Sequence, residues 1–339
     1  MKVNSVISLM LICLFASCNK DESSKIPTIY IAGYEYGGAN NIAKYWKDGK
    51  EVALTNGTRW AEAYSIFVVG NDVYVAGTEE NSRGIDLAKY WKNGVPVALS
   101  NEEFKSSKAT DIFVVGNDVY VAGSEFNGLT REAKYWKNGV AVALTDGLQT
   151  SEATAIVVFS NDIYIAGQET GKGSNRVAKY WKNGQSISLT SGATDSYASD
   201  IFVDAKGVYV AGAEVKSINN TNKYIAQYWK NGVAVPLSSS SSSVSSITVV
   251  GDDVYLTGDE SNGTKDIIKY WKNGIGFSLT DDTSYSSSYD IGVVGSDVYV
   301  VGGENTLVGY QVAKYWKNGK IISLTNGATG STATAIFIK

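Results

Sequence analysis

Histidine is absent from the 339 residues of this sequence, and cysteine occurs only twice, at Cys13 and Cys18. A chain without histidine has no imidazole base, no Ser-His catalytic pair and no His-ligated zinc or copper. A chain without cysteine after position 18 has neither disulfide bonds nor thiolate chemistry in its body. We therefore expect no metal site and no cofactor, and the remaining residues form no recognisable catalytic motif.

The first residues have the pattern of a secretory signal. Lys2 is followed by an apolar run over residues 6–16, too short to span a bilayer stably, and then by Ser17 and Cys18. The segment Phe15-Ala16-Ser17-Cys18 resembles the lipobox of bacterial lipoproteins, although Phe15 stands where that motif usually has Leu, Val or Ile. The resemblance implies a signal peptide over residues 1–17 and a lipid on Cys18. The alternative is an ordinary signal peptide with an unrelated cysteine.

Residues 18–27 are polar and lack apolar periodicity, so we expect a flexible acylated tether. The acidic pair Asp21-Glu22 resembles the surface-export signal of Bacteroidetes lipoproteins. It implies a cell-envelope protein anchored in the outer membrane with its body facing outward. A plain solvated linker would have the same composition.

Acidic residues outnumber basic ones along the chain, 34 against 30. Removal of residues 1–17 takes away one lysine, Lys2, and no acidic residue. Basic residues form no cluster of the kind that nucleic-acid binding requires. We expect no nucleic-acid partner and a monomeric protein.

One motif, Ala-Lys-Tyr-Trp-Lys-Asn-Gly, recurs along the chain with small changes. Its tryptophans are spaced 45, 45, 45, 48, 42 and 45 residues apart, at Trp46, Trp91, Trp136, Trp181, Trp229, Trp271 and Trp316. In one unit the ranges 112–115, 119–125, 133–137 and 140–144 are rich in β-branched and aromatic residues, and Asn138-Gly139 predicts a tight hairpin between the last two. Four short antiparallel strands in about 45 residues are typical of a β-propeller blade.

The two ends of the repeat region complement each other. Residues 27–33 correspond to the second strand of a unit, and residues 333–338 correspond to a first strand with nothing after it. The sequence therefore predicts an all-β, seven-bladed β-propeller over residues 28–339, in which the C-terminal strand completes the N-terminal blade and removes an open edge. An open solenoid is the alternative, but it would need distinct capping repeats.

The pattern resembles seven-bladed propellers such as the kelch and tryptophan–aspartate repeat kinds, without the signature of either. It has no kelch double glycine in each unit, and it has neither Gly-His nor Trp-Asp. It also resembles repeats of uncharacterised Bacteroidetes lipoproteins, from which no activity follows.

Other repeated residues suggest structural roles. We expect each motif tryptophan to cover a strand glycine, with Gly77 facing Trp91 and Glu79 facing Lys89. Carboxylates recur at Glu35, Glu79, Glu125, Glu169, Glu214, Glu260 and Glu304, and lysines at Lys44, Lys89, Lys134, Lys179, Lys269 and Lys314, with Gln227 in the remaining place. We interpret these sets as packing and neutralised charge pairs. The alternatives are a ring of sugar-stacking tryptophans and a ring of carboxylates that binds a cation or acts in acid–base pairs.

Loops that do not repeat indicate the face that binds a ligand. In propellers the connections between blades and those between second and third strands open on one face, here called the variable face. Its loops carry most of the candidate ligand-binding residues, which are Trp60, Glu62, Tyr64, Tyr36, Phe104, Phe126, Tyr197 and Tyr285. Trp60 is the only tryptophan outside the repeat, and capping of a hydrophobic edge is its alternative role.

Three functions agree with these observations. The first is a non-catalytic cell-envelope module that presents the variable face to a glycan, a peptide or a partner protein. The second is a carboxylate-dependent glycan hydrolase or lyase, with Glu62 or Asp195 as candidate residues. A purely structural subunit of an envelope complex is a third reading.

Overall fold

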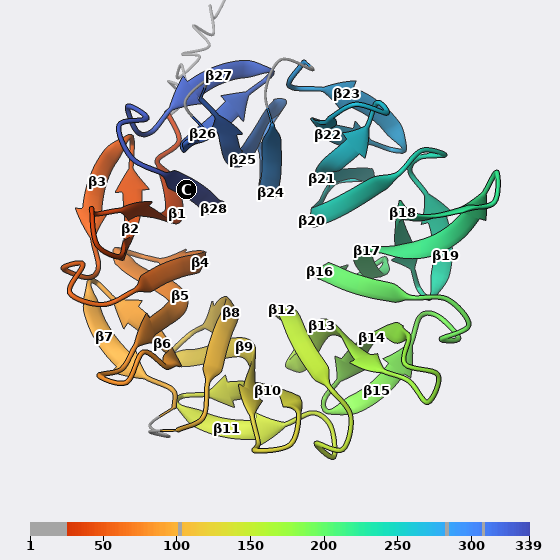
Figure 1. Ribbon diagram of the computed structural model, residues 1–339, viewed down its shortest axis with the longest axis horizontal. Coiled ribbons are helices and arrows are strands. Elements are labelled where there is room, and N and C mark those ends of the chain that lie inside the picture. Colours follow the sequence, from red (N-terminus) through yellow and green to blue (C-terminus); the bar gives the residue numbers. More distant parts are fainter. Residues whose placement is uncertain (1–25, 101–103, 282–284, 307–308) are drawn as a thin grey trace, which may run out of the picture.

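The computed structural model describes residues 26–100, 104–281, 285–306 and 309–339. The predicted signal peptide, Cys18 and nearly all of the predicted tether lie outside these ranges. Within them the regular elements are 28 strands arranged in seven four-stranded antiparallel sheets. Figure 1 shows the sheets as blades of a ring around a central channel. The predicted seven-bladed propeller is confirmed, and no helix in the described ranges has the length and apolar character needed to cross a membrane.

Each blade runs from an inner strand at the channel to a short outer strand at the rim. From the inside outward, blade 1 is β28 (Ser331–Ile338), β1 (Ile29–Tyr36), β2 (Asn41–Lys47) and β3 (Lys50–Ala53); blade 2 is β4 (Ala61–Val69), β5 (Asp72–Glu80), β6 (Asp86–Lys92) and β7 (Val95–Ala98); blade 3 is β8 (Ser107–Val115), β9 (Asp118–Phe126), β10 (Arg131–Lys137) and β11 (Val140–Ala143); blade 4 is β12 (Ser151–Phe159), β13 (Asp162–Thr170), β14 (Arg176–Lys182) and β15 (Gln185–Ser188). Blade 5 is β16 (Ser196–Asp204), β17 (Gly207–Ile218), β18 (Thr221–Lys230) and β19 (Val233–Pro236); blade 6 is β20 (Ser242–Val250), β21 (Asp253–Ser261), β22 (Asp266–Lys272) and β23 (Ile275–Ser278); blade 7 is β24 (Ser286–Val294), β25 (Asp297–Asn305), β26 (Gln311–Lys317) and β27 (Lys320–Ser323).

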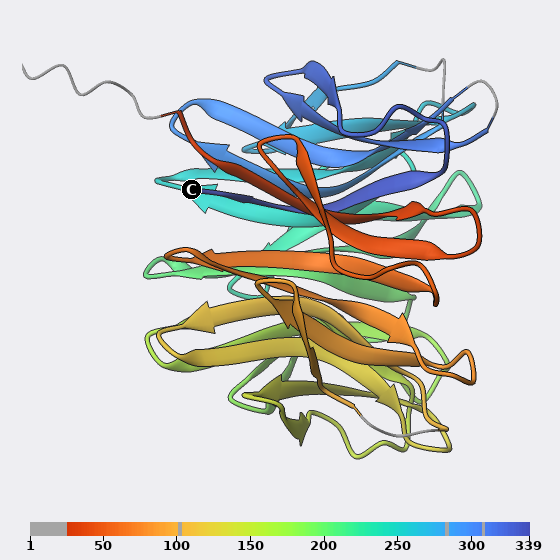
Figure 2. The ribbon, with the colours of Figure 1, turned by 90° about the vertical axis from the view of Figure 1, so that its left-hand side faces the viewer.

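The ring closes where the two ends of the repeat region meet. Strand β28 pairs antiparallel with β1, with Ile336 opposite Ile31. Beyond this pair, the Thr28 amide donates to the Lys339 carbonyl at 2.8 Å, and the Lys339 amide donates back at 2.9 Å. The predicted closure is confirmed, and it removes the edge that β1 would otherwise expose. Seen edge on in Figure 2, the strands cross the disc between its two faces.

The Asn-Gly hairpins have the predicted tight geometry. Asn93 and Gly94 both have positive φ, 50° and 80°, as a type I′ turn requires. The Asn93 side chain accepts a hydrogen bond from the Val73 amide at 2.8 Å and donates to Asp72 at 2.8 Å. The asparagine thus ties the outer hairpin of its blade to the inner one, on the face opposite the variable loops.

All seven motif tryptophans are buried, with at most 2% of their surface exposed. Each packs between blades. Trp136 of blade 3, for example, belongs to one buried cluster with Ala76 and Ala88 of blade 2. Their burial supports the packing role, because an indole without exposed surface cannot stack on a sugar.

The expected register of the second and third strands was wrong by two residues. Gly77 lies opposite Lys89 and Glu79 lies opposite Leu87, while Trp91 faces Val75. The charge pair nevertheless forms along a diagonal, with Lys89 Nζ 2.5 Å from Glu79 Oε2. Lysine and tryptophan are long enough to reach a diagonal neighbour, so a contact between side chains does not fix which backbones are opposite.

The predicted Glu–Lys pairs form in six blades. They are Glu35–Lys44, Glu79–Lys89, Glu125–Lys134, Glu169–Lys179, Glu260–Lys269 and Glu304–Lys314. Blade 5, with Gln227, differs. There Glu214 accepts a hydrogen bond from Thr194 at 3.1 Å, and Lys216 contacts Gln227 at 3.4 Å.

Candidate functional site at the channel mouth

Every inner strand contains a β-bulge at the same place in its blade. The bulged residue points into the channel, and the seven are Tyr64, Thr110, Thr154, Ser199, Ser245, Tyr289 and Thr334. Several of them bond to the next blade, as when Thr110 Oγ1 donates to the Ala153 carbonyl at 2.9 Å and Thr154 Oγ1 donates to that of Ala198 at 3.1 Å. This belt of hydroxyl groups links neighbouring blades around the axis.

Three aspartates, Asp111, Asp200 and Asp290, form the next layer of the channel. Each carboxylate accepts one hydrogen bond from the backbone amide of the residue that follows it and another from the backbone amide at the equivalent position of the next blade. Asp111, for instance, accepts from Ile112 at 2.8 Å and from Ile156 at 2.7 Å. They lie deep in the ring, although each keeps part of its surface open to the channel. Burial raises the pKa of all three, to about 7 for Asp200 and about 6 for Asp290.

Above the belt the channel widens into a cavity of about 550 Å³ on the variable face, here called the mouth cavity. Four tyrosines from four blades line it: Tyr34 of β1, Tyr64 of β4, Tyr197 of β16 and Tyr289 of β24. The rest of the wall is mostly polar or charged, including Gln168, with Ala198 and Val244 as apolar residues. A volume of this size with a mixed aromatic and polar lining is typical of sites for small ligands.

Three of the predicted site residues, Trp60, Glu62 and Tyr64, form one network, and of these Tyr64 lines the cavity. Glu62 Oε1 accepts from Trp60 Nε1 at 3.0 Å and from Asn41 Nδ2 at 2.8 Å, while Oε2 accepts from the Tyr64 hydroxyl at 2.6 Å. Burial, together with the Glu62 charge, raises the pKa of Tyr64. Since both oxygens of Glu62 hold donors, the residue positions the two aromatic side chains.

Tyr197 is the fourth predicted residue that the structure brings to the mouth. Its ring lies 5.6 Å from that of Tyr224, measured between centroids, and the Arg176 guanidinium carbon lies 5.6 Å from its centroid. Arg176 in turn binds Asp195 with both Nε and Nη2, the latter at 2.7 Å from Oδ2. Although burial opposes it, hydrogen bonding by Arg176 and Tyr224 lowers the pKa of Asp195 to about 2. Asp195 is therefore a bound anion that supports the aromatic wall.

The other four predicted residues, Tyr36, Phe104, Phe126 and Tyr285, are exposed and do not line the mouth cavity. Tyr36 donates its hydroxyl hydrogen to the Gly38 carbonyl at 2.8 Å. Phe104 is covered by the Arg83 guanidinium at 4.6 Å from its ring centroid. The structure thus separates the predicted residues into a group at the channel and a group elsewhere on the surface.

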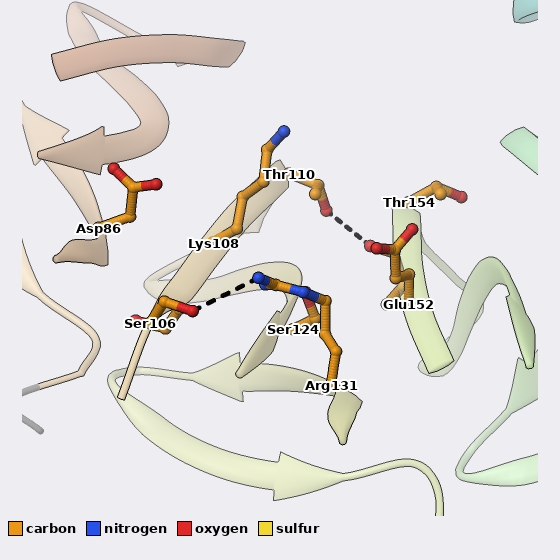
Figure 3. A pocket seen from close by; sticks show the side chains of 10 residues that line it. Asp86, Ser106, Lys108, Thr110, Ser124, Arg131, Glu152 and Thr154 are labelled. Carbon is orange, nitrogen blue, oxygen red and sulfur yellow. Dashed lines mark hydrogen bonds between the residues drawn. The ribbon is translucent and has the colours of Figure 1, made fainter. Parts of the chain in front are cut away.

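Next to the mouth cavity a second hollow of about 390 Å³, the side pocket, opens between blades 2, 3 and 4. Asp86, Lys108, Arg131 and Glu152 are its charged residues, and Figure 3 shows the two cations between the two carboxylates. This site was not predicted from the sequence. The available signal was divergence at one repeat position, because Lys108 corresponds to Glu62 in blade 2 and to Tyr197 in blade 5.

A smaller hollow of about 180 Å³ lies beside Tyr197 and contains Asp259 and Asp266. Burial raises the pKa of Asp259 to about 7, with a smaller contribution from the Asp266 charge, against hydrogen bonds from Ser288 and Ser243. In the described part of the chain, no three acidic side chains lie together as ligands for a metal ion.

No protein-family model and no curated protein matches this sequence. Solved structures match its fold. A puromycin-hydrolysing peptidase of Mycobacterium tuberculosis aligns with a TM-score of 0.60 and 8% identity over 88% of this chain, and puromycin hydrolase aligns with 0.61 and 10% over 89%. The β-propeller domain of the Trilobed protease from Pyrococcus furiosus aligns with 0.53 and 10% over 88% of this chain and 94% of that domain. This chain spans 53% and 52% of the first two proteins, and at these identities the likeness shows the propeller fold alone.

Proposed function

We propose that this protein is a non-catalytic binding module of the cell envelope, held by a lipid on Cys18, that takes a hydroxyl-rich glycan at the channel mouth. The observation that carries the proposal is the convergence of Tyr34, Tyr64, Tyr197 and Tyr289 on one cavity of about 550 Å³. Tyrosine offers a flat apolar face to a sugar ring and a hydroxyl group to its edge. The seven-bladed ring fixes the four side chains from four directions.

The surroundings of the tyrosines support this role. Trp60 and Tyr64 are held by Glu62, and the Tyr197 ring is contacted by both Arg176 and Tyr224. Aromatic side chains fixed in this way lose little conformational entropy when a ligand binds, which favours affinity. The face with irregular loops is also the face on which the cavity opens, as expected for a site on a rigid scaffold.

A screen of soluble glycans followed by titration calorimetry tests the proposal. Tyr197→Ala removes one wall of the mouth cavity, so we expect it to weaken binding of any glycan identified by at least about tenfold. Tyr310→Ala is the matched control, because Tyr310 is an exposed tyrosine outside the cavity lining. Binding that is equal in both variants, or the absence of any glycan ligand, would contradict the proposal.

A carboxylate-dependent hydrolase or lyase is the second candidate, and one observation favours it. Asp259, with its pKa of about 7 beside Asp266, has the protonation behaviour of a general acid in a pair of carboxylates. Glu62 and Asp195, the residues suggested by the sequence, are already engaged by several donors. Cleavage of a bound glycan that is lost in Asp259→Asn, with binding retained, would favour this function over the first.

A further inference from the structure

Lysine and arginine side chains of this protein are generally engaged by carboxylates. Six repeat lysines pair with glutamates, and Lys92, Lys137, Lys182, Lys272 and Lys317 pair with aspartates on the opposite face. In the side pocket the pattern differs. Arg131 donates to Ser124 Oγ at 3.2 Å and to Ser106 Oγ at 3.4 Å, and Lys108 Nζ lies 4.1 Å from the centroid of the Tyr64 ring. Among the described residues neither cation has a carboxylate within ion-pair distance.

An internal comparison shows what Arg131 lacks. Arg131 and Arg176 are the first residues of equivalent strands, β10 and β14. Arg176 is neutralised by Asp195, which directly precedes inner strand β16. The position equivalent to Asp195 in the preceding blade is Thr150, directly before β12. Arg176 thus has a carboxylate partner from the next blade, whereas Arg131 has none at the equivalent position.

The side pocket also holds groups that accept hydrogen bonds. Figure 3 shows Asp86 and Glu152 on either side of Lys108 and Arg131. Glu152 accepts one hydrogen bond, from Gln168 Nε2 at 2.9 Å, and Ser106, Ser124 and other hydroxyl groups line the wall. Ala153 is the only apolar residue of the lining. A peptide with apolar side chains would find little to pack against, whereas a sugar would find acceptors for its hydroxyl groups.

We infer that the side pocket binds the carboxylate of an acidic sugar between Lys108 and Arg131, with its hydroxyl groups on Asp86 and Glu152. The inference rests on the proposed glycan function and names the class of glycan, a uronic acid within a chain whose next sugar reaches the mouth cavity. Lys108 and Tyr64 connect the two, since Lys108 lines both cavities and covers the Tyr64 ring. Arginine is suited to the role because its planar fork binds a carboxylate through two hydrogen bonds.

Titration calorimetry with tri-galacturonate tests the inference, with the neutral galactose trisaccharide as the comparison. We expect tri-galacturonate to bind, the neutral trisaccharide to bind at least about tenfold more weakly, and Arg131→Gln and Lys108→Met each to weaken tri-galacturonate by at least about tenfold. Lys137→Gln is the matched control. Lys137 lies at the other end of the same strand, on the opposite face, and pairs with Asp118 at 2.9 Å.

Thr150→Asp provides a second variant that adds a charge to an exposed position instead of removing one from the pocket. It gives Arg131 the partner that Asp195 gives Arg176, so we expect it to abolish tri-galacturonate binding while the thermal transition is retained. Equal affinity for both trisaccharides, or unchanged affinity in Arg131→Gln and Thr150→Asp, would overturn the inference. Binding of a neutral glycan that depends on Tyr197 but not on Arg131 would overturn this inference and leave the proposed function intact. If no glycan binds at all, the proposed function is overturned as well.

Discussion

Asp200 and Asp290, on the inner strands of blades 5 and 7, are joined through one hydroxyl oxygen. Ser246 Oγ of the blade between them lies 2.8 Å from Asp200 Oδ2 and 2.7 Å from Asp290 Oδ1. A hydroxyl group carries one hydrogen, so it donates to one carboxylate, and the second contact is a hydrogen bond only when the other carboxyl is protonated. The geometry agrees with the raised pKa values of both aspartates, which burial produces, with a smaller contribution from the Asp290 charge at Asp200 and from the Asp111 charge at Asp290.

This pair predicts an unusual dependence of stability on pH. Because the folded pKa values of about 7 and about 6 exceed the ordinary value of 3.8, the folded state binds more protons than the unfolded state between these limits. The contribution of the pair to the free energy of unfolding is therefore largest below pH 4 and is lost as the pH rises to about 7, by several kcal/mol in total, since a pKa difference of one corresponds to about 1.4 kcal/mol. Urea denaturation at pH 5, 6, 7 and 8 measures the slope.

Asp290→Ala serves as the control for that slope, because alanine occupies the equivalent position in blades 1 and 4, at Ala335 and Ala155. The variant loses hydrogen bonds and is less stable throughout, but we expect its stability to vary less between pH 5 and pH 8. An equal dependence of stability on pH in the variant and in the original protein would contradict the proposed protonation of this aspartate pair.

Gly123 is predicted to tolerate no side chain. A Cβ at this position would lie 1.9 Å from the Lys108 carbonyl oxygen and 2.9 Å from Trp136 Cζ3. We expect Gly123→Ala to lower the free energy of unfolding by more than about 2 kcal/mol, since the backbone of β8 or the indole must move. In Gly173→Ala, where the added Cβ would meet nothing within 4 Å, the change should stay within about 1 kcal/mol. Similar losses in the two variants would contradict the steric argument.

Asn138 contributes to stability through its backbone and its side chain. Its φ of 52° disfavours alanine, and its side chain bonds to the Val119 amide and to Asp118, both at 2.8 Å. We expect Asn138→Ala to cost about 2 kcal/mol in chemical denaturation. Asn138→Gly retains the turn but not the bonds, so it should cost about half as much. No cost in Asn138→Gly would show that the side-chain bonds contribute nothing, and equal costs in the two variants would show that the positive φ contributes nothing.

Removal of residues 331–339 is predicted to open the ring. Strand β1 then loses its partner β28 and exposes a full row of unpaired backbone groups. We expect self-association in size-exclusion chromatography and a broad thermal transition by circular dichroism. Addition of a peptide with the sequence 331–339 should restore the monomer, and a truncated chain that stays monomeric without it would contradict the closure.

The fold could be predicted from the sequence because each blade repeats the same local sequence signals. Trp91, Asn93 and Gly94 occupy equivalent places in every unit or nearly so, and each signals a neighbour in its own blade or the next. The register failed where two different pairings satisfy the same contact, since Lys89 reaches Glu79 along a diagonal. The role of Gly123 was only half predicted, because the bulge that brings the Lys108 carbonyl so close leaves no mark in the composition.

The candidate site was harder to predict for a different reason. Trp60, Glu62 and Tyr64 lie within five residues of one another in the sequence, and all three were predicted as ligand-binding residues. The side pocket joins Asp86, Arg131 and Glu152 from three blades. Such residues come together only through the packing of neighbouring blades. The spacing of residues in a single sequence does not indicate which side chains meet across two blades.

The hydrogen bonds between Thr28 and Lys339 bring the two ends of the propeller together in one blade. Since the two ends meet within one sheet, a short linker could join them and the chain could be opened in another turn without disturbing any strand pair. We expect a circular permutant that begins at Gly184, in the outer hairpin of blade 4, to fold into the same ring and to keep the same channel mouth. The blade at which the polypeptide begins is therefore not expected to affect the folded ring, because the positions of the residues around the channel depend only on the closed circle of blades.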